Sequence, residues 1–197
     1  MKHTIILIAM LVLGIAGASA QEGGNNDANR WSFGARAGVN FAHDTDLNTS
    51  SNTGFDLDFL SDFHLRNKLY LRTGLGFRQF RQTWTSWYLD AGTKNTMVGN
   101  TINLPLRLAW KLPLGANLHL DMETGAFLSY AVGGKIGNGD NKHDTYESGF
   151  KNRYNFGADF GAGISFKQFY LGVSNTFNYR NIAPAFTSAV KFGYTFK

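Results

Sequence analysis

The sequence contains no cysteine, and only three of its 197 residues are proline. Without cysteine the chain forms no disulfide and carries no lipid anchor on a cysteine. The scarcity of proline leaves long stretches without the residue that interrupts strand ladders. Because 23 residues are glycine and 15% are aromatic, the composition instead indicates strands and turns.

Long apolar runs are also missing beyond the N-terminus. No later segment has 18 consecutive apolar residues, so the sequence does not predict a helical membrane protein. Residues 1–20 have a charged start, a short apolar core and small residues before Gln21, which predicts a cleaved secretory signal peptide. We expect a polar periplasmic leader at residues 21–30 and one domain at residues 31–197.

The chain has no strong excess of charge of either sign. Its formal net charge is +5, and it falls to +4 when Lys2 leaves with the signal peptide. These charges are scattered evenly, so we expect no nucleic-acid partner.

Strict alternation of apolar and polar residues dominates what is present, and residues 150–179 show it best. Phe156, Phe160 and Ile164 fall on one face of an extended strand, whereas Asp159 and Gly163 fall on the other. The alternation restarts after residues 167–168, which indicates a tight turn between two strands. Each strand has about ten residues or more, which is the length that a tilted strand needs to cross a bilayer.

The same alternation recurs along the chain and predicts eight strands. The expected strands cover residues 31–41, 55–65, 69–78, 101–110, 118–130, 150–166, 169–179 and 186–196. Short turns alternate with longer loops at residues 43–52, 81–99, 133–148 and 180–184. This pattern predicts an all-β fold, an eight-stranded antiparallel up-and-down transmembrane β-barrel in the bacterial outer membrane. Pro105 lies inside the fourth strand, where we expect a local interruption of the ladder.

A soluble β-sandwich or a lipocalin-like barrel is the rival fold. Such a protein packs its apolar side chains inside and exposes its polar ones to water. The glycine-rich polar face and the near absence of charge on the apolar faces favour the membrane barrel.

Four motifs resemble those of the small porin-like, PorT-type outer-membrane β-barrel proteins. Residues 36–41 resemble the "K-x-G-x-N" first strand of that family, with Arg36 in place of the lysine. Residues 103–108 resemble its "E-I-P-L-L-L" fourth strand, and residues 156–164 its "G-x-x-x-G-x-G" sixth strand. Residues 192–196 resemble the aromatic C-terminal signal that the barrel-assembly machinery recognises. The resemblance implies a barrel, with outer-membrane lipid and that machinery as partners, but no particular activity.

The inward faces of the predicted strands carry charges of both signs. In an eight-stranded barrel side chains essentially fill the interior, so these charges must pair with one another. By strand depth, one ion-pair network is expected near mid-membrane, formed by Arg36, Asp58, Arg72, Arg107, Glu123, Asp159 and Lys191.

The sequence offers no catalytic, cofactor or metal site of its own. His119 is followed two residues later by Asp121, where a lipid A deacylase would place a serine, and both point inward. Two sets of residues have side chains of the kind that bind metal ions: Asp44 with Asp46, and Asp140 with residues 143–144. Such residues are common in solvated loops, so we predict no metal site from them. The loop at residues 81–99 carries the best binding candidates: Trp84, Trp87 and Tyr88.

We therefore predict a non-enzymatic outer-membrane barrel with a structural or partner-binding role. Envelope assembly, secretion and adhesion are the roles considered, with a protein or a glycan bound at the outer loops. A narrow porin for solutes or ions is the alternative, and a lipid-modifying enzyme is a more distant one.

Overall fold

The computed structural model describes residues 30–43, 49–86, 93–138, 141–145, 153–179 and 185–196. The predicted signal peptide and all but the last residue of the predicted leader lie outside these residues. Within the part of the chain described, no helix is long and apolar enough to span a membrane. The strands are β1 (Trp31–His43), β2 (Thr49–Arg66), β3 (Leu69–Ser86), β4 (Thr93–Pro113), β5 (Leu118–Asn138), β6 (Asn141–Asp144), β7 (Tyr154–Phe166), β8 (Phe169–Asn178) and β9 (Phe186–Phe196).

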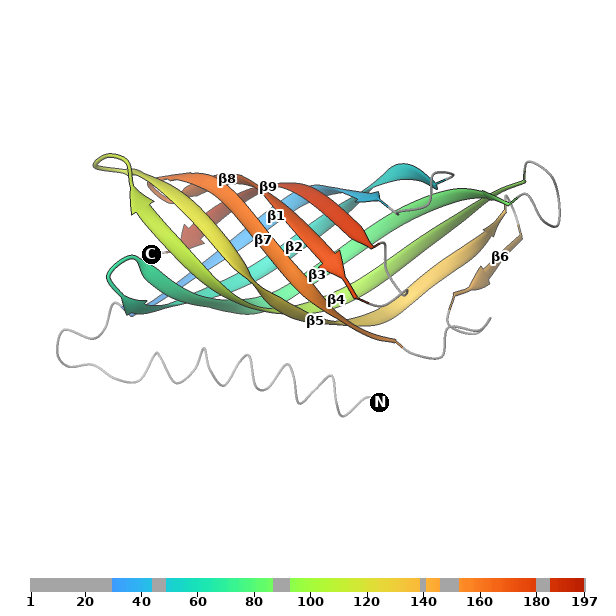
Figure 1. Ribbon diagram of the computed structural model, residues 1–197, viewed down its shortest axis with the longest axis horizontal. Coiled ribbons are helices and arrows are strands. Elements are labelled where there is room, and N and C mark those ends of the chain that lie inside the picture. Colours follow the sequence, from blue (N-terminus) through green and yellow to red (C-terminus); the bar gives the residue numbers. More distant parts are fainter. Residues whose placement is uncertain are drawn as a thin grey trace.

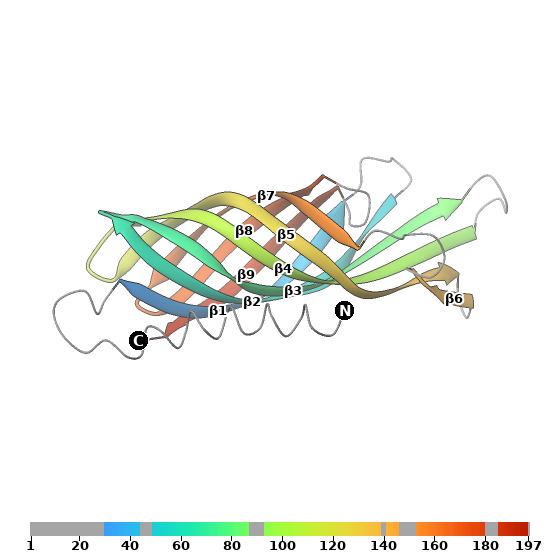
Figure 2. The same ribbon diagram turned by 90° about the horizontal axis from the view of Figure 1, so that it is seen from below.

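Eight of these strands form a closed antiparallel barrel. Neighbours pair in the order β1, β2, β3, β4, β5, β7, β8 and β9, and β9 pairs with β1 to complete the ring. Figures 1 and 2 show the tilted strands of this tube from two directions. A closed ring has no free edge, so every strand finds backbone hydrogen-bond partners on both sides. The predicted eight-stranded barrel is confirmed.

The wall of the barrel is apolar outside and polar inside. Leu106, Leu128 and Leu171 point outward and each exposes more than half of its surface, whereas Glu123 and Asp159 are buried in the interior. Exposed apolar side chains on this scale are stable only against lipid. The rival soluble barrel, which requires the inverse arrangement, is therefore excluded.

Aromatic side chains gather at both ends of the apolar band. Trp31 and Phe63 lie 4.8 Å apart between ring centroids at the turn end. Tyr130 and Tyr154 lie 5.1 Å apart at the loop end. Two such girdles match the two interfaces of a membrane.

The strands do not all end at the same level. β3, β4 and β5 continue beyond the barrel and pair with one another, the start of β2 pairs with β3, and the short β6 is added to β5. We call this extension the outer sheet and define it as residues 49–51, 79–86, 93–100, 133–138 and 141–144. In Figure 1 it projects past the ends of β8 and β9.

The outer sheet corrects our expectation of long loops at residues 81–99 and 133–148. Arg81 pairs with Val98, and Ser86 pairs with Thr93, so most of the first of these segments is a two-stranded ladder. The prediction failed because neither face of a strand outside the membrane has to be uniformly apolar. Here the outward face is wet and the inward face mixes the buried Gln82 with Phe80 and Met97, which removes the alternation on which the prediction relied.

Two irregularities mark the fourth strand and its neighbour. The β3–β4 pairing passes from Thr73 opposite Leu106 to Gly76 opposite Asn103, and the ladder is interrupted at Pro105 as expected. In β5, Thr101 lies opposite Ala131 but Asn100 lies opposite Gly133. Val132 is therefore a bulge, and side chains beyond it change face.

Candidate functional site

Glu123 on β5 is the centre of the barrel interior. Its carboxylate contacts three arginines from three other strands: Arg36 Nη1 lies 3.1 Å from Oε2, Arg107 Nη1 lies 3.6 Å from Oε1, and Arg72 Nη1 also contacts Oε2. All four side chains are nearly inaccessible to solvent. A buried carboxylate is stable here because its partners supply several charge-assisted hydrogen bonds. Glu123 thereby ties opposite walls of the barrel together.

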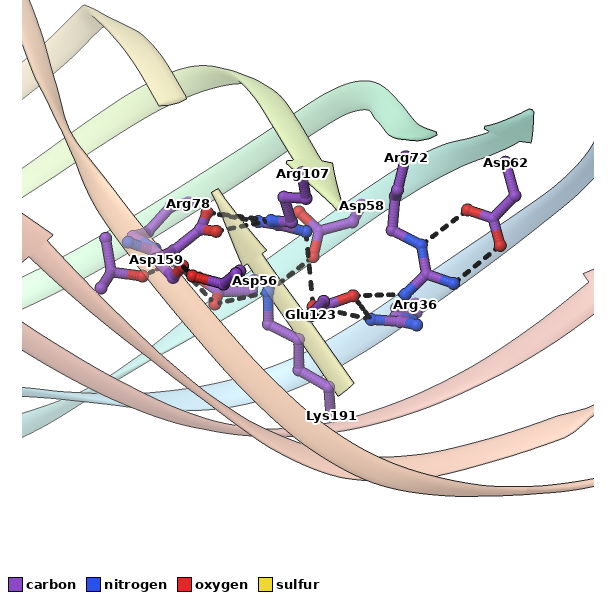
Figure 3. A network of polar contacts seen from close by, with 12 residues as sticks. Arg36, Asp56, Asp58, Asp62, Arg72, Arg78, Arg107, Glu123, Asp159 and Lys191 are labelled. Atoms are coloured by element: carbon purple, nitrogen blue, oxygen red, sulfur yellow. Dashed lines mark hydrogen bonds and ion pairs between the residues drawn. The ribbon is translucent and has the colours of Figure 1, made fainter. Parts of the chain in front are cut away.

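Two further carboxylates complete this group of charges. Arg72 Nε lies 2.6 Å from Asp62 Oδ1, and Lys111 Nζ lies 2.7 Å from Asp62 Oδ2. Arg107 Nη2 lies 2.8 Å from Asp159 Oδ2. The contacts thus run from Asp62, near the turn end, to Asp159 further along the barrel. In Figure 3, arginine side chains from different strands point toward the same carboxylates.

A second group lies beside the first. Arg78 Nε is 2.9 Å from Asp56 Oδ1, and Asn40 Nδ2 donates to the same oxygen at 2.8 Å. Lys191 Nζ is 2.6 Å from Asp58 Oδ2 and 3.4 Å from Asp56 Oδ2. Lys191 therefore joins two carboxylates that stand at alternate positions of β2.

The long cationic side chains fit because glycines lie opposite them. Arg36 faces Gly193 on β9, where a Cβ atom would lie 2.6 Å from Arg36 Cγ. Lys191 faces Gly38 on β1, where a Cβ atom would lie 2.7 Å from Lys191 Cγ. The glycines of the polar face therefore supply the volume that the ion pairs occupy.

The structure places all seven residues of the predicted interior set inside the barrel, in two adjoining groups instead of one. Arg36, Arg72, Arg107, Glu123 and Asp159 belong to the first group, and Asp58 and Lys191 belong to the second. The prediction missed Lys111, which pairs with Asp62. Extending the alternation of β4 from Arg107 by four residues would have found it.

The charges of the described interior nearly balance. The ion-paired cations are Arg36, Arg72, Arg78, Arg107, Lys111 and Lys191, and the carboxylates are Asp56, Asp58, Asp62, Asp121, Glu123 and Asp159. Arg153, directly before β7 on the inward side, adds one more positive charge. This near balance lowers the electrostatic cost of burying the charges.

An apolar cluster closes the interior toward the loop end. Phe80 and Ala42 each expose 1% of their surface and pack with Met97 and Ile136. The ring of Phe80 lies against Gly99, where a Cβ atom would be 2.2 Å from its Cζ. Phe80, Met97 and Ile136 belong to the outer sheet, so the cluster lies where that sheet joins the barrel, beyond the ion pairs.

The turn end is more open. Tyr170 stacks beneath Arg36, with the guanidinium carbon 3.7 Å from the ring centroid. A cavity of about 30 Å³ lies beside this pair, and a mouth of about 360 Å³ opens below it toward the turns. By volume the small cavity has room for two or three waters at most, since each needs about 10 to 15 Å³.

Ser165 comes close to His119 and Asp121 at this mouth. The β5–β7 register sets Ser165 directly opposite His119, and the Ser165 hydroxyl donates to Asp121 Oδ2. A nucleophilic serine needs a base that takes its proton and a third group that orients that base. Here the hydroxyl bonds the carboxylate instead, so the contact does not form that relay. The register between β5 and β7, which sets Ser165 opposite His119, could not be predicted from the sequence of either strand alone.

The other predicted site residues lie largely elsewhere. Trp87 and Tyr88 fall outside the described residues, and Trp84 belongs to β3, where its backbone pairs with Asn95. Of the metal-ligand types considered, Asp44, Asp46 and Asp140 also fall outside. His143 and Asp144 lie in β6. Among the described residues, no group of three or more acidic or histidine side chains is placed to hold a metal ion.

Comparisons with known proteins agree with this architecture. A family model described as outer membrane protein beta-barrel domain matches residues 19–183. Neisserial surface protein A is 13% identical with a TM-score of 0.52, and the alignment covers 86% of this chain and 97% of that one. The N-terminal β-barrel domain of Pseudomonas aeruginosa OprF is 13% identical, with a TM-score of 0.46 and coverages of 85% and 98%. The outer membrane enzyme PagL is 12% identical, with a TM-score of 0.46 and coverages of 83% and 99%. No curated protein matches the sequence. At such identities, the likeness to Neisserial surface protein A shows the fold alone.

Proposed function

The chain belongs to the outer membrane protein beta-barrel domain family, and we propose that it is a closed, non-enzymatic scaffold that binds a partner outside the membrane. It is a protein of the bacterial outer membrane. The observation that carries the proposal is the contrast between an interior filled by ion pairs and three strands that continue far beyond the barrel.

The filled interior argues against transport. Glu123 and its three arginines occupy the cross-section of the barrel, and the Phe80 cluster lies beyond them, where the outer sheet joins the barrel. Passage of an ion would require these pairs to separate, and an unpaired buried charge costs several kcal/mol. The wide mouth at the turn end is the feature that favours the alternative, a narrow porin for solutes or ions.

Planar-bilayer recording of the purified folded protein tests the closed interior. We expect no conductance steps from the wild type, because ion pairs and the Phe80 cluster fill the described part of the interior. Glu123→Ala serves as the comparison, since it frees three arginines and leaves space between them. Reproducible steps from the wild type, at a size that Glu123→Ala changes, would establish the porin and end the closed-scaffold proposal.

The outer sheet supports the partner-binding half of the proposal. Its strands present backbone and side chains above the membrane, and Trp84 lies in its β3 segment. Aromatic side chains are common anchors in interfaces. We assign Trp84, Trp87 and Tyr88 to the contact with a protein or glycan, in a role in envelope assembly, secretion or adhesion.

Site-specific photo-crosslinking in living cells tests this contact. A photoreactive residue replaces Lys94, which is exposed in the outer sheet, or Lys68, which is exposed at the β2–β3 turn. We expect one defined product from position 94 and none of that size from position 68. Replacing Trp84, Trp87 and Tyr88 by alanine should remove the product. If the product persists in that variant, these aromatic residues do not form the contact.

A lipid-modifying activity is the remaining alternative, and the bond between Ser165 and Asp121 argues against it. Mass spectrometry of lipid A from cells with and without the protein distinguishes the two. Identical lipid A is expected, and a loss of one acyl chain only in cells expressing the protein would contradict the non-enzymatic assignment.

The last strand supplies a further partner in this proposal. β9 ends in alternating aromatics, Phe192, Tyr194 and Phe196, that all point outward. We assign this strand to recognition by the barrel-assembly machinery, and deletion of residues 192–197 should leave the protein unfolded in the periplasm.

A further inference from the structure

A row of three residues, two of them cationic, crosses the outward face of the outer sheet. Arg81 on β3 lies directly opposite Val98 on β4, and Val98 lies directly opposite Lys135 on β5. Adjacent strands are about 4.8 Å apart, so the two cationic residues stand about 10 Å apart with a valine between them. Both are exposed.

The row lines a pocket of about 600 Å³. Its walls include Arg81, Lys135, Asn100 and Asp144, and Val98 supplies an apolar patch between the two cations. Asp144 lies opposite Lys135 on β6 and contributes the one carboxylate among the lining residues. Two cations and one carboxylate leave the lining positive, which suits an anionic ligand that also has an apolar part.

The bulge at Val132 brings Lys135 into this row. Before the bulge, odd-numbered residues of β5 such as Glu123 and Ala131 point into the barrel. After it, Ile136 packs inward and Lys135 points outward. Bulges commonly re-aim a side chain in this way. In a regular strand Lys135 would face the interior.

The pocket faces the lipid side at the height of the membrane surface. Arg81 lies twelve residues beyond Leu69, where β3 begins. At about 3.3 Å per residue and a tilt of about 40°, this corresponds to about 30 Å along the barrel axis. The apolar band of such barrels is about 25 Å tall, so Arg81 stands just above it. Below Arg81 on the same face, Gln79 bonds Asn100, and Phe77 is the last apolar residue of the band.

We infer that this pocket binds the phosphorylated headgroup of a lipid in the outer leaflet, with Arg81 and Lys135 holding phosphate oxygens. A guanidinium binds phosphate through two parallel hydrogen bonds, and an ammonium adds a second positive charge. Val98 and the apolar band beneath the pocket then lie along the hydrophobic part of the same lipid. The inference goes beyond the partner contact proposed above and does not depend on it.

Native mass spectrometry of the purified full-length folded protein in detergent tests the inference. The probe is diphosphorylated lipid A, compared with the same lipid A after enzymatic removal of its phosphates. We expect the wild type to retain the phosphorylated lipid, and Arg81→Gln with Lys135→Gln to bind it about tenfold more weakly, because two charge-assisted contacts are lost. The matched control, Arg66→Gln with Lys68→Gln, removes one arginine and one lysine at the turn end and should bind as the wild type does.

Val98→Trp provides a second variant, because it keeps both cations but fills the space between them, and it should also weaken binding. The boiled and unboiled gel mobility of each variant reports whether the barrel has folded. Equal retention by the wild type and the Arg81/Lys135 variant would overturn the inference, as would equal binding of dephosphorylated lipid A. Displacement of lipid A by inorganic phosphate alone would identify a site for free phosphate and would equally overturn the assignment to a lipid.

Discussion

The wall of this barrel is about twice as long on one side as on the other. β4 and β5 each have 21 residues, whereas β8 has 10 and β9 has 11. The short strands remain within the membrane, where lipid on one side and ion pairs on the other fix which way each residue faces. The outer sheet has no such constraint. Its cohesion comes from backbone pairing and from the apolar cluster around Phe80.

The two regions therefore depend on different interactions, and each can be weakened separately. The membrane part is held by closure of the ring and by buried charge, so losses there act on the whole barrel. The outer sheet is held by a few local contacts, so losses there remain local.

The largest effect is expected from the centre of the ion pairs. Glu123→Leu leaves Arg36, Arg72 and Arg107 without their shared carboxylate and should lower the free energy of unfolding by about 3 to 5 kcal/mol. Urea unfolding in phospholipid vesicles measures it. Lys68→Gln, at an exposed turn, is the control and should change little. A loss below about 1 kcal/mol for Glu123→Leu would show that the arginines find other partners.

A local effect is expected from Phe80→Ala. Removing this buried ring should cost about 3 kcal/mol in the apolar cluster and loosen the outer sheet without opening the barrel. Limited proteolysis should then cut within the outer sheet, while unboiled protein still migrates as a folded barrel. Phe77→Ala, in the same strand on the lipid face, is the matched control and should not expose the outer sheet. Unfolding of the whole barrel by Phe80→Ala would mean that the two regions are not separable.

The smallest effect compares two glycines of the two regions. A Cβ at Gly38 would lie 2.5 Å from the Val190 carbonyl oxygen, whereas a Cβ at Gly133 has no atom within 4 Å. Gly38→Ala should destabilise the barrel by about 1 to 3 kcal/mol, and Gly133→Ala by close to zero. The urea unfolding midpoints of the two variants measure this difference in stability. Similar midpoints would show that the wall at Gly38 shifts to accommodate the methyl group.

The membrane part was predictable because lipid and the barrel interior require different residue types at alternate positions. Residues such as Phe160 and Ile164 must meet lipid and residues such as Asp159 must not, so the period of two reveals both the strand and its inward face. The inward position of Glu123 and the arginines follows from the same rule. The pairing of each arginine with a particular carboxylate does not follow from this rule, because the partners come from different strands.

The outer sheet was not predictable in this way. Residues 81–86 and 93–100 show no regular alternation of apolar and polar residues, because Met97 is the one apolar residue that they contribute to the buried cluster, so the sequence predicted a loop. The outward turn of Lys135 depends on a single bulged residue, Val132, which leaves no mark in the alternation.

The sequence by itself determined the number of strands in the barrel, their faces and their place in the outer membrane, because lipid and lumen impose opposite chemistry on alternate residues. Only the tertiary structure decided the pairing of charges around Glu123, the extent of the outer sheet and the row that joins Arg81 to Lys135. Each of these rests on the register between strands, which is fixed when the ring closes and not by any strand alone.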